Sequence, residues 1–378
     1  KEINSLYVED IQAEDLIKNG IDGMLDGLDP YTVYYPESEI EDYKLMTTGQ
    51  YGGIGARIKK IGDYLTIKEI FENSPSMKAN LIPGDKILEV DGNIIKDQSS
   101  YELSKLLKGT PGTEVKIKVQ RVGEDDPIEK TFKREEIKIS SVPFYGMLDD
   151  EVGYIKMTSF TRQVSEEVKN AYSDLKNTHQ MKKLVFDLRG NPGGLLMESI
   201  NIVNMFIPKG EVVVETRGKV ENWNKEYKSL NKPQDLNIPV VILVDKGSAS
   251  ASEIVSGALQ DLDRAIVIGK NTYGKGLVQT TVKLKYNSSL KVTTAKYYIP
   301  SGRCIQEVNY GKKDKYGKGI KKADSLRVKF KTKNGREVED GHGIQPDIEI
   351  WKEKLNYITR SILKENHIFH FVNKYVQS

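Results

Sequence analysis

The sequence predicts a multi-domain α/β protein. Its 378 residues are enough for two or three domains of ordinary size. Short β-rich runs separated by Gly and Pro fill residues 50–140, and from about residue 150 buried strands alternate with helices, as in a sheet layered with helices. Both ends have helical patterns. The predicted parts are a helical segment at 1–49, a small β-rich domain at 50–140, an α/β core at 141–350 and a helical tail at 351–378.

Composition excludes several classes of function. Lys and Arg number 57 and Asp and Glu 54, so a net charge of +3 gives no reason to expect a nucleic-acid groove or a polybasic membrane anchor. One cysteine, Cys304, excludes an intramolecular disulfide and a multi-cysteine metal site, and four histidines leave little room for a histidine-rich one. We therefore expect no metal. No apolar run approaches the ~18 residues of a membrane helix. The chain begins at Lys1, so we expect a trimmed N-terminus, which carries no information about location.

Hydrophobic periodicity and helix-breaking residues predict the helices and strands in order along the chain. The first segment has apolar residues at helical spacing up to Leu25, and Asp29-Pro30 ends the pattern. Residues 310–340, rich in Lys, Gly and Asp, are expected to form an exposed excursion. The remaining predictions are strands at 64–67, 115–119, 153–160, 184–188 and 239–244, helices at 100–107, 165–176 and 195–206, and an antiparallel hairpin of strands 278–284 and 290–297.

A serine-rich turn follows the buried strand at 239–244 and opens a helix whose apolar stripe faces a core. Ser250 is thereby placed beside the free N–H groups of a helix start, which suit a developing oxyanion. The alternative is structural. Ser250-Ala251-Ser252-Glu253 also fits a capping box, and Ser248 could cap the helix as well.

A serine nucleophile needs a base. No histidine lies in a setting that suggests a Ser-His-Asp triad, although chain order alone does not exclude one. Lys275 is the candidate, because glycines flank it and no acid lies within five positions. Desolvation would have to lower the pKa of this amine from ~10.4 to ~7–8. The alternative is a lysine in an exposed turn. Ser173-Asp174-Leu175-Lys176 also matches S-x-x-K, but it lies on a polar helix face and no K-T-G follows.

Several segments together resemble one family. GSASASEIVSGALQD and GKNTYGKGLVQ, with DLRGNPGG, TTAKYYIPSGRCIQ and GIQPDI, are similar to the carboxy-terminal processing proteases, tail-specific serine proteases that carry a PDZ domain. The likeness runs from about residue 15 to 350. It implies a crotonase-like α/β protease core with an inserted PDZ domain and no cofactor.

The resemblance also implies site residues. Ser250 would be the nucleophile, Lys275 the general base and Gln279 the residue that orients the lysine. The backbone N–H groups of Ala251 and Gly194 would form the oxyanion hole, with Gly218 as an alternative donor. Four residues of extended strand span ~13 Å, so the role of Gln279 requires a bend in the chain around Gly276.

Residues 50–140 resemble the PDZ domain of these enzymes. Gly53, Ile54, Gly55 and Ala56 occupy the position of the carboxylate-binding loop, where successive N–H groups hold a peptide's terminal carboxylate while the peptide adds as a strand. The alternative is an ordinary hairpin turn. Asn80 stands where the family usually has Gly.

The resemblance implies a serine endopeptidase that cleaves protein substrates near free, apolar C-termini, in the cell envelope outside the cytoplasm. Because Gly274 and Gly276 make the loop of Lys275 easy to displace, we also expect peptide capture by the PDZ domain to switch activity, and a resting structure to hold Lys275 away from Ser250. Two other hypotheses are a non-catalytic PDZ adaptor on an inactive protease-like core and, from the crotonase likeness, an acyl-CoA enzyme. The helical ends would serve a homodimer, as in some relatives, or simply pack on the core.

Overall fold

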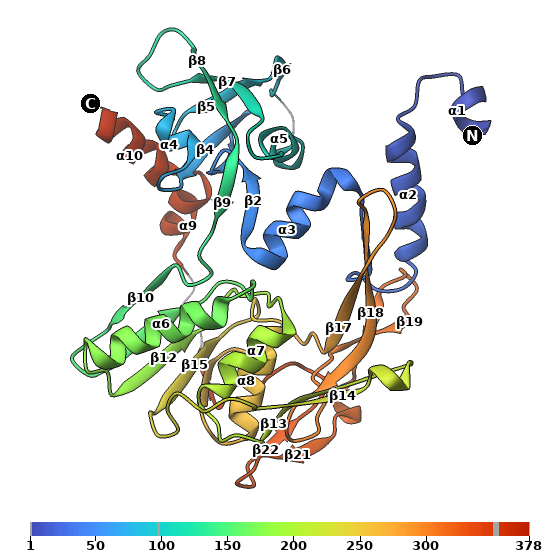
Figure 1. The fold of residues 1–378 in the computed structure, drawn as a ribbon, viewed down its shortest axis with the longest axis vertical. Coiled ribbons are helices and arrows are strands. Elements are labelled where there is room, and N and C mark those ends of the chain that lie inside the picture. Colours follow the sequence, from blue (N-terminus) through green and yellow to red (C-terminus); the bar gives the residue numbers. More distant parts are fainter. Residues whose placement is uncertain (1, 97–98, 351–354, 378) are drawn as a thin grey trace. The chain divides into compact units, whose positions relative to one another are not determined.

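The computed structural model describes residues 2–96, 99–350 and 355–377, and the chain divides into two compact units (Figure 1). Residues 1–40 and 140–351 form the first unit, here called the core unit. Residues 41–139 and 352–378 form the second, here called the β unit. Each terminal segment is therefore part of a larger unit. The four-part division by sequence stays a prediction.

A six-stranded sheet organises the core unit. Its order is β10-β11-β12-β15-β16-β23, and every neighbouring pair except β10–β11 is parallel. Because parallel crossovers are right-handed and this order advances in one direction, the connecting helices fall on one face. Figure 1 shows α6, α7 and α8 together there. The bounds are β10 Phe144–Met147, β11 Val152–Lys156, α6 Val164–Asn177, β12 Lys183–Asp187, α7 Leu196–Asn204, β15 Val240–Val244, α8 Ala251–Asp261, β16 Ile266–Gly269 and β23 Ile348–Glu349.

Helix α8 lies in the interior of the core unit. It contacts β16 of the first sheet and β13 of a second sheet, and all eleven of its residues are buried. Its polar side chains therefore bond inside the protein: the Ser252 hydroxyl donates to the carbonyl of Asn191 (2.9 Å) and the Ser256 hydroxyl to that of Ser252 (2.8 Å). Burial on every side explains why this helix can carry serines where a surface helix would carry charges.

The second sheet of the core unit has the order β1-β18-β13-β14, with β17 also paired to β18. The hairpin predicted at 278–284 and 290–297 is confirmed as the antiparallel pair β17–β18. Strand β1 adds beside it, with Val33 opposite Lys291, and so brings the N-terminal segment onto this sheet. The bounds are α1 Glu2–Leu6, α2 Ala13–Leu25, β1 Val33–Tyr35, η1 Glu37–Glu39, β13 Val212–Gly218, η2 Glu221–Trp223, β14 Lys225–Lys228, β17 Leu277–Lys283 and β18 Ser289–Tyr298.

Residues 310–340 are more ordered than the sequence suggested. They contribute to two small antiparallel sheets, β19–β20 and β21–β22, although most of their side chains are exposed as expected. Charged residues on a two-stranded sheet hide the alternation that would have identified strands. The bounds are β19 Val308–Lys313, β20 Gly319–Lys321, η3 Asp324–Leu326, β21 Lys329–Lys331 and β22 Glu337–Glu339.

The β unit has a sheet of order β3-β4-β5-β7-β8 around its own apolar core, with β6 paired to β5. The helix predicted at 100–107 is confirmed as α5. Asn80 has φ +58°, a left-handed conformation that Asn tolerates, so the turn survives without Gly. The bounds are α3 Ile40–Thr48, β2 Gln50–Gly53, β3 Ala56–Ile61, β4 Tyr64–Ile70, α4 Pro75–Lys78, β5 Lys86–Val90, β6 Asn93–Ile94, α5 Ser100–Leu107, β7 Glu114–Gln120, β8 Ile128–Lys133 and β9 Glu135–Lys138.

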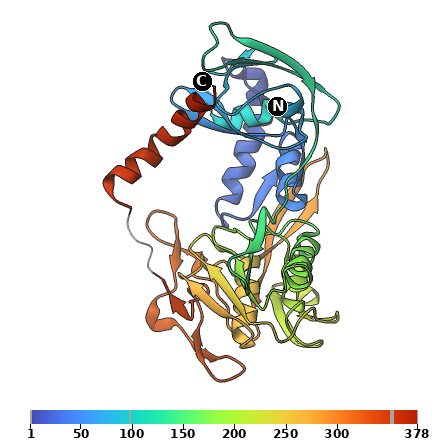
Figure 2. The ribbon, with the colours of Figure 1, turned by 90° about the vertical axis from the view of Figure 1, so that its left-hand side faces the viewer.

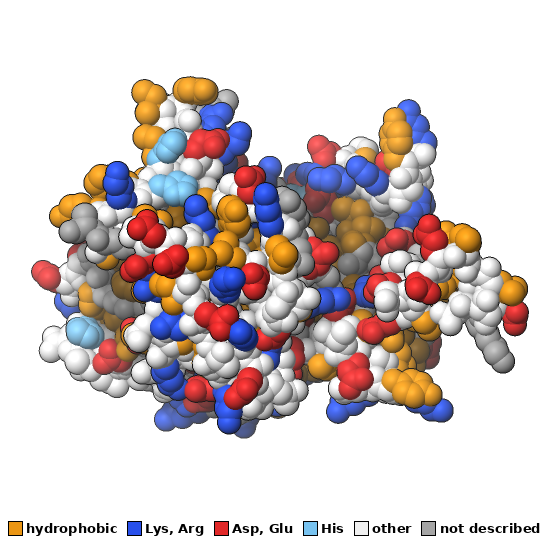
Figure 3. Space-filling view, turned by 90° about the horizontal axis from the view of Figure 1, so that it is seen from above, with side chains coloured by type: hydrophobic (Ala, Val, Ile, Leu, Met, Phe, Trp, Pro, Cys, Tyr) orange, Lys and Arg blue, Asp and Glu red, His pale blue; other side chains and the backbone are white. Residues whose placement is uncertain are grey.

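The predicted helical tail consists of α9 Tyr357–Lys364 and α10 His367–Gln377, red in Figure 2. Its first four residues, 351–354, lie outside the described residues. On the face drawn in Figure 3, acidic and basic side chains are interspersed, in keeping with the near-neutral net charge. In the part of the chain that the structure describes, none of the helices has the length and apolar character needed to cross a membrane.

Candidate active site

Three loops of the core unit meet at the carboxyl ends of neighbouring parallel strands. They follow β12, β15 and β16, and they carry Gly194, Ser250 and Lys275 respectively. Backbone hydrogen bonds join them: Ala249 N–H donates to the carbonyl of Asn191 (3.0 Å) and Tyr273 N–H to that of Ser248 (2.9 Å). This edge is where α/β sheets commonly place their ligands. The topology thus brings together three sequence-predicted site residues that lie up to 81 positions apart.

Ser250 occupies a strained turn. Its φ of +55° and ψ of −113° lie outside the extended region that an ordinary N-cap adopts, and such strain gathers at functional sites. The neighbouring serines have structural tasks: the Ser248 hydroxyl donates to the carbonyl of Leu188 (2.8 Å), and that of Ser252 is bound as described above. Both are fully buried, whereas Ser250 is only half-buried. Of the three, Ser250 is the one with surface exposed to solvent.

The loop after β12 lies against Ser250. A Cβ added to Gly193 would come 2.8 Å from Cβ of Ser250 and 2.9 Å from N of Ala251. The neighbouring Gly194 has φ +146°, and the N–H of Ala251 begins α8, where helical N–H groups lack helical partners. The alternative donor Gly218 is occupied, because its N–H donates to Oδ1 of Asn224 (2.7 Å).

If the N–H of Gly194 is an oxyanion-hole donor, replacing Gly194 with Ala should lower kcat by about 10²–10³-fold, the usual cost of losing such a donor. Its Cβ would come 2.4 Å from the carbonyl oxygen of Phe160, so the loop must shift. Gly210→Ala is the matched control, since Gly210 also has positive φ (+94°) but nothing within 4 Å of the added carbon. Steady-state peptide hydrolysis, with thermal unfolding of each variant, checks this. If the folded Gly194→Ala protein keeps the native kcat, Gly194 has no role in the oxyanion hole.

Lys275 is half-buried, and its amine lies over the ring of Tyr31, 4.1 Å from the centroid. Burial, and to a smaller extent the positive charge of Lys291, lower the pKa of Lys275 to about 8, although Glu253 and Asp29 act in the opposite direction. Within the described residues, the amine of Lys275 makes no hydrogen bond to Ser250. Both residues lie at the same edge of the sheet, but the amine of Lys275 is not hydrogen-bonded to the hydroxyl of Ser250.

Two buried side chains link the backbones of Ser250 and Lys275. Oε2 of Glu253 accepts the N–H of Ser250 (2.7 Å) and the N–H of Lys275 (2.9 Å). The hydroxyl of Tyr297 lies 3.1 Å from the carbonyl oxygen of Ser250 and 2.6 Å from that of Lys275. The two loops are therefore held together on both sides. Sequence reasoning considered Glu253 only as a capping residue and gave Tyr297 no role.

Glu253 has further partners on its other oxygen. Oε1 accepts the hydroxyl of Thr272 (2.5 Å) and the N–H of Gly274 (2.7 Å). The carboxyl is fully buried, and burial raises its pKa to about 7 against the opposing effect of these hydrogen bonds. The carboxyl group of Glu253 thus holds the loop of residues 272–275 against the start of α8.

Gln279 lies on β17 beside a bulge, where Val278 pairs with Ala295 but Gln279 pairs with Thr293. Its amide donates to Oγ1 of Thr293 (3.3 Å). The structure does not bring it into hydrogen-bond contact with Lys275 within the described residues. Its role as the residue that orients the lysine stays a prediction.

In the β unit, close packing requires glycines at the predicted carboxylate-binding loop. Gly55 has φ +74°, and its added Cβ would come 2.3 Å from Cβ of Ser74. The carbonyl of Ile54 accepts both the N–H (2.9 Å) and the hydroxyl (2.7 Å) of Ser76. Ala56 then begins β3, an edge strand that pairs only with β4 in the described sheet. An edge of this kind can accept a peptide as an added strand.

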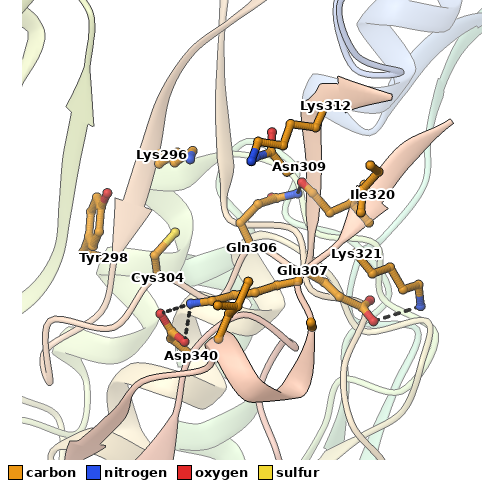
Figure 4. Close-up of a pocket in the computed structure, with 14 residues that line it drawn as sticks. Lys296, Tyr298, Cys304, Gln306, Glu307, Asn309, Lys312, Ile320, Lys321 and Asp340 are labelled. Atoms are coloured by element: carbon orange, nitrogen blue, oxygen red, sulfur yellow. Dashed lines mark hydrogen bonds and ion pairs between the residues drawn. The ribbon is translucent and has the colours of Figure 1, made fainter. Parts of the chain in front are cut away.

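A cavity of about 470 Å³ is lined by residues of β18, of β19 and of the segment between them, with others from β20 onward (Figure 4). Gln306 lines it and also accepts the N–H of Gly276 through Oε1 (2.7 Å). Cys304 lines it too, and burial raises the pKa of its thiol, which disfavours the reactive thiolate. Across residues 2–96, 99–350 and 355–377, no three His, Cys, Asp or Glu side chains cluster as a metal site requires.

Comparisons with known proteins define the class. The model of peptidase family S41 matches residues 151–313, and that of the PDZ domain matches residues 52–131. The chain is 35% identical over 309 residues to the carboxy-terminal-processing protease of Bartonella bacilliformis, covering 81% of this chain and 70% of that protein. It is 36% identical over 370 residues to a probable CtpA-like serine protease of Staphylococcus aureus, covering 94% and 71%. A solved putative S41 protease from Bacteroides fragilis shares the fold, at 17% identity and a TM-score of 0.52, over 97% of this chain and 90% of that one.

The fold is therefore that of an S41 protease with a PDZ domain. The chain belongs to peptidase family S41, among the carboxy-terminal-processing proteases, and is a serine-type peptidase.

Proposed function

We propose that this peptidase cleaves protein substrates near their C-termini through a Ser250–Lys275 dyad. Ser250 is the nucleophile, Lys275 the general base, and the N–H groups of Gly194 and Ala251 form the oxyanion hole. The observation that carries this proposal is the pair of hydrogen bonds from the N–H groups of Ser250 and Lys275 to one oxygen of Glu253. It keeps a strained serine beside a lysine whose pKa of about 8 leaves part of the amine neutral at physiological pH.

The reaction follows from these positions. The neutral amine of Lys275 takes the proton of the Ser250 hydroxyl as Oγ attacks the peptide carbonyl, and negative charge develops on the carbonyl oxygen. The lysine then gives its proton to the leaving amine, and an acyl-enzyme remains. Water, deprotonated by the same lysine, hydrolyses the ester. No cofactor is needed.

The amine must first leave the ring of Tyr31 and reach Ser250. We infer that this is the resting arrangement and that Gln279 orients the lysine once it has moved. A free, apolar carboxy terminus would bind to the loop of Gly53, Ile54, Gly55 and Ala56, and this capture would favour the active arrangement. Charge-assisted hydrogen bonds from backbone N–H groups to a carboxylate provide the affinity.

The remaining proposals concern location and assembly. We place the enzyme in the cell envelope, as the family resemblance implies. A homodimer through the terminal helices is supported by their exposed apolar side chains, such as Ile17 (61% exposed) and Phe371 (68%).

The test uses the full chain and one peptide substrate in two forms, with a free C-terminal carboxylate or a C-terminal amide. Native protein should cleave the free form, and Ser250→Ala should reduce turnover by at least about 10⁴-fold. The amide should lower kcat/KM by roughly 10- to 100-fold, because a hydrogen bond to a charged group contributes about 1.5–3 kcal/mol. Equal turnover by Ser250→Ala would remove the nucleophile. Equal rates for both peptide forms would remove carboxylate capture, and absence of any native turnover would favour the PDZ adaptor.

A further inference from the structure

The turn Asp29–Thr32, in a segment to which the sequence assigned no chemistry, lies against the predicted base. We propose that this turn is part of the active centre and that the aromatic face of Tyr31 is a positioning surface that holds the amine of Lys275 and shields it from water. The inference rests on the proposed role of Lys275. The contact that carries it is the 4.1 Å separation between Nζ of Lys275 and the ring centroid of Tyr31.

Asp29 anchors the turn. Its Oδ1 accepts the N–H of Tyr31 (2.8 Å) and the N–H of Thr32 (3.0 Å), and its Oδ2 accepts the Thr32 hydroxyl (3.0 Å). From the neighbouring strand β18, Thr293 donates its hydroxyl to Asp29 Oδ1 (3.1 Å) and its N–H to Oγ1 of Thr32 (3.2 Å). Since Gln279 donates to the same Thr293 hydroxyl, the turn, Gln279 and the strand form one network.

Two other tyrosines hold the ring of Tyr31 in place. Its hydroxyl lies 3.3 Å from the hydroxyl of Tyr273, two residues before Lys275, and 3.3 Å from that of Tyr310. The ring also meets Tyr310 edge-on, with centroids 5.8 Å apart and an interplanar angle of 88°. The hydroxyl end is thus held by neighbours on the lysine loop and on β19, which leaves a ring face for the amine.

The position has two opposite effects on the amine. The π face attracts the ammonium form, whereas exclusion of water disfavours that form. Other charges around Lys275 come from three elements: Lys291 on β18, Glu253 on α8 and Asp29 on the turn itself. Desolvation is the largest of these influences, and the pKa of Lys275 falls to about 8. Tyr31 therefore holds the amine away from Ser250, while the pKa of the amine stays close to the range that proton transfer at neutral pH requires.

Substitutions of Tyr31 separate these effects. Tyr31→Ala exposes the amine, so its titration midpoint should rise from about 8 toward the ordinary ~10.4, and kcat/KM at pH 7 should fall by roughly 100-fold. Tyr31→Phe keeps the ring face, so the midpoint should stay near 8. Tyr31→Leu keeps the apolar volume without the π face, so the midpoint should stay at or below the native value. Tyr286→Ala, at an 89% exposed tyrosine on the tip of the β17–β18 hairpin, is the control that should change nothing.

The midpoint is measured in two ways: from the pH dependence of kcat/KM, and by NMR titration of ¹³C-labelled lysine in the Ser250→Ala protein, with Lys275→Met assigning the signal. The NMR readout needs no activity. If native protein shows no Ser250-dependent turnover, the proposed function fails, and the titration still tests Tyr31. An unchanged midpoint in Tyr31→Ala, or an equally raised midpoint in Tyr31→Phe, would overturn the proposal.

Discussion

Lys275→Arg should lower kcat by at least about 10⁴-fold, as far as Lys275→Met does, while the protein stays folded. Arginine keeps the positive charge and much of the length of lysine, but its guanidinium stays protonated in proteins and cannot supply a neutral base. Side-chain charge alone would predict partial activity in the Arg variant and none in the Met variant. Single-turnover acylation with an activated ester, followed at saturating substrate, measures the step directly. Comparable rates for Arg and native protein would exclude proton abstraction by Lys275.

The same assignment predicts the pH profile of the native enzyme. The amine acts in its neutral form, so kcat/KM should rise with pH and level off above the midpoint near 8. At pH 7 only about a tenth of the amine is neutral. Glu253 acts in its ionised form and has a pKa of about 7, so the decline should steepen below that pH. A profile that is flat from pH 6 to 9, with chemistry shown to be rate-limiting, would contradict both roles.

The second large effect is expected from Glu253→Gln. The carboxylate accepts three backbone N–H groups and one hydroxyl, and glutamine replaces one acceptor oxygen with an NH₂ group that faces these donors. We expect the free energy of unfolding to fall by about 2–4 kcal/mol, the range for breaking buried charged hydrogen bonds. We also expect kcat to fall at least about 100-fold, because a small displacement of positioned groups has effects of this size.

Glu198→Gln is the matched control for this experiment. Glu198 is also buried and also accepts backbone N–H groups, but those of Gln163 (3.1 Å) and Ser165 (2.9 Å), neither of which belongs to the lysine loop. It should lose stability but retain kcat. Denaturant unfolding and peptide hydrolysis on both variants give the comparison. Equal kcat losses in the two variants would show that Glu253 acts only through general stability.

Local patterns were sufficient for much of the fold. The apolar run at 239–244 and the stripe of the following helix predicted β15 and α8, because a parallel strand buried on both faces and a core-facing helix each require an uninterrupted local signature. The hairpin β17–β18 followed from strands that flank a polar turn. By contrast, the small sheets of residues 308–339 were missed, since charged, exposed strands lack such a signature.

The same division applies to the site. Ser250 and Lys275 could be recognised as candidates from the sequence, because each lies in a short segment with a local pattern: a helix start and a glycine-flanked lysine. Only the tertiary structure joins the two loops through Glu253 and Tyr297 and brings Tyr31 from the N-terminal turn onto the amine of Lys275. The contacts of Glu253 and Tyr297 depend on strand order, and that of Tyr31 depends on pairing between β1 and β18, segments more than 200 residues apart. No local periodicity records either.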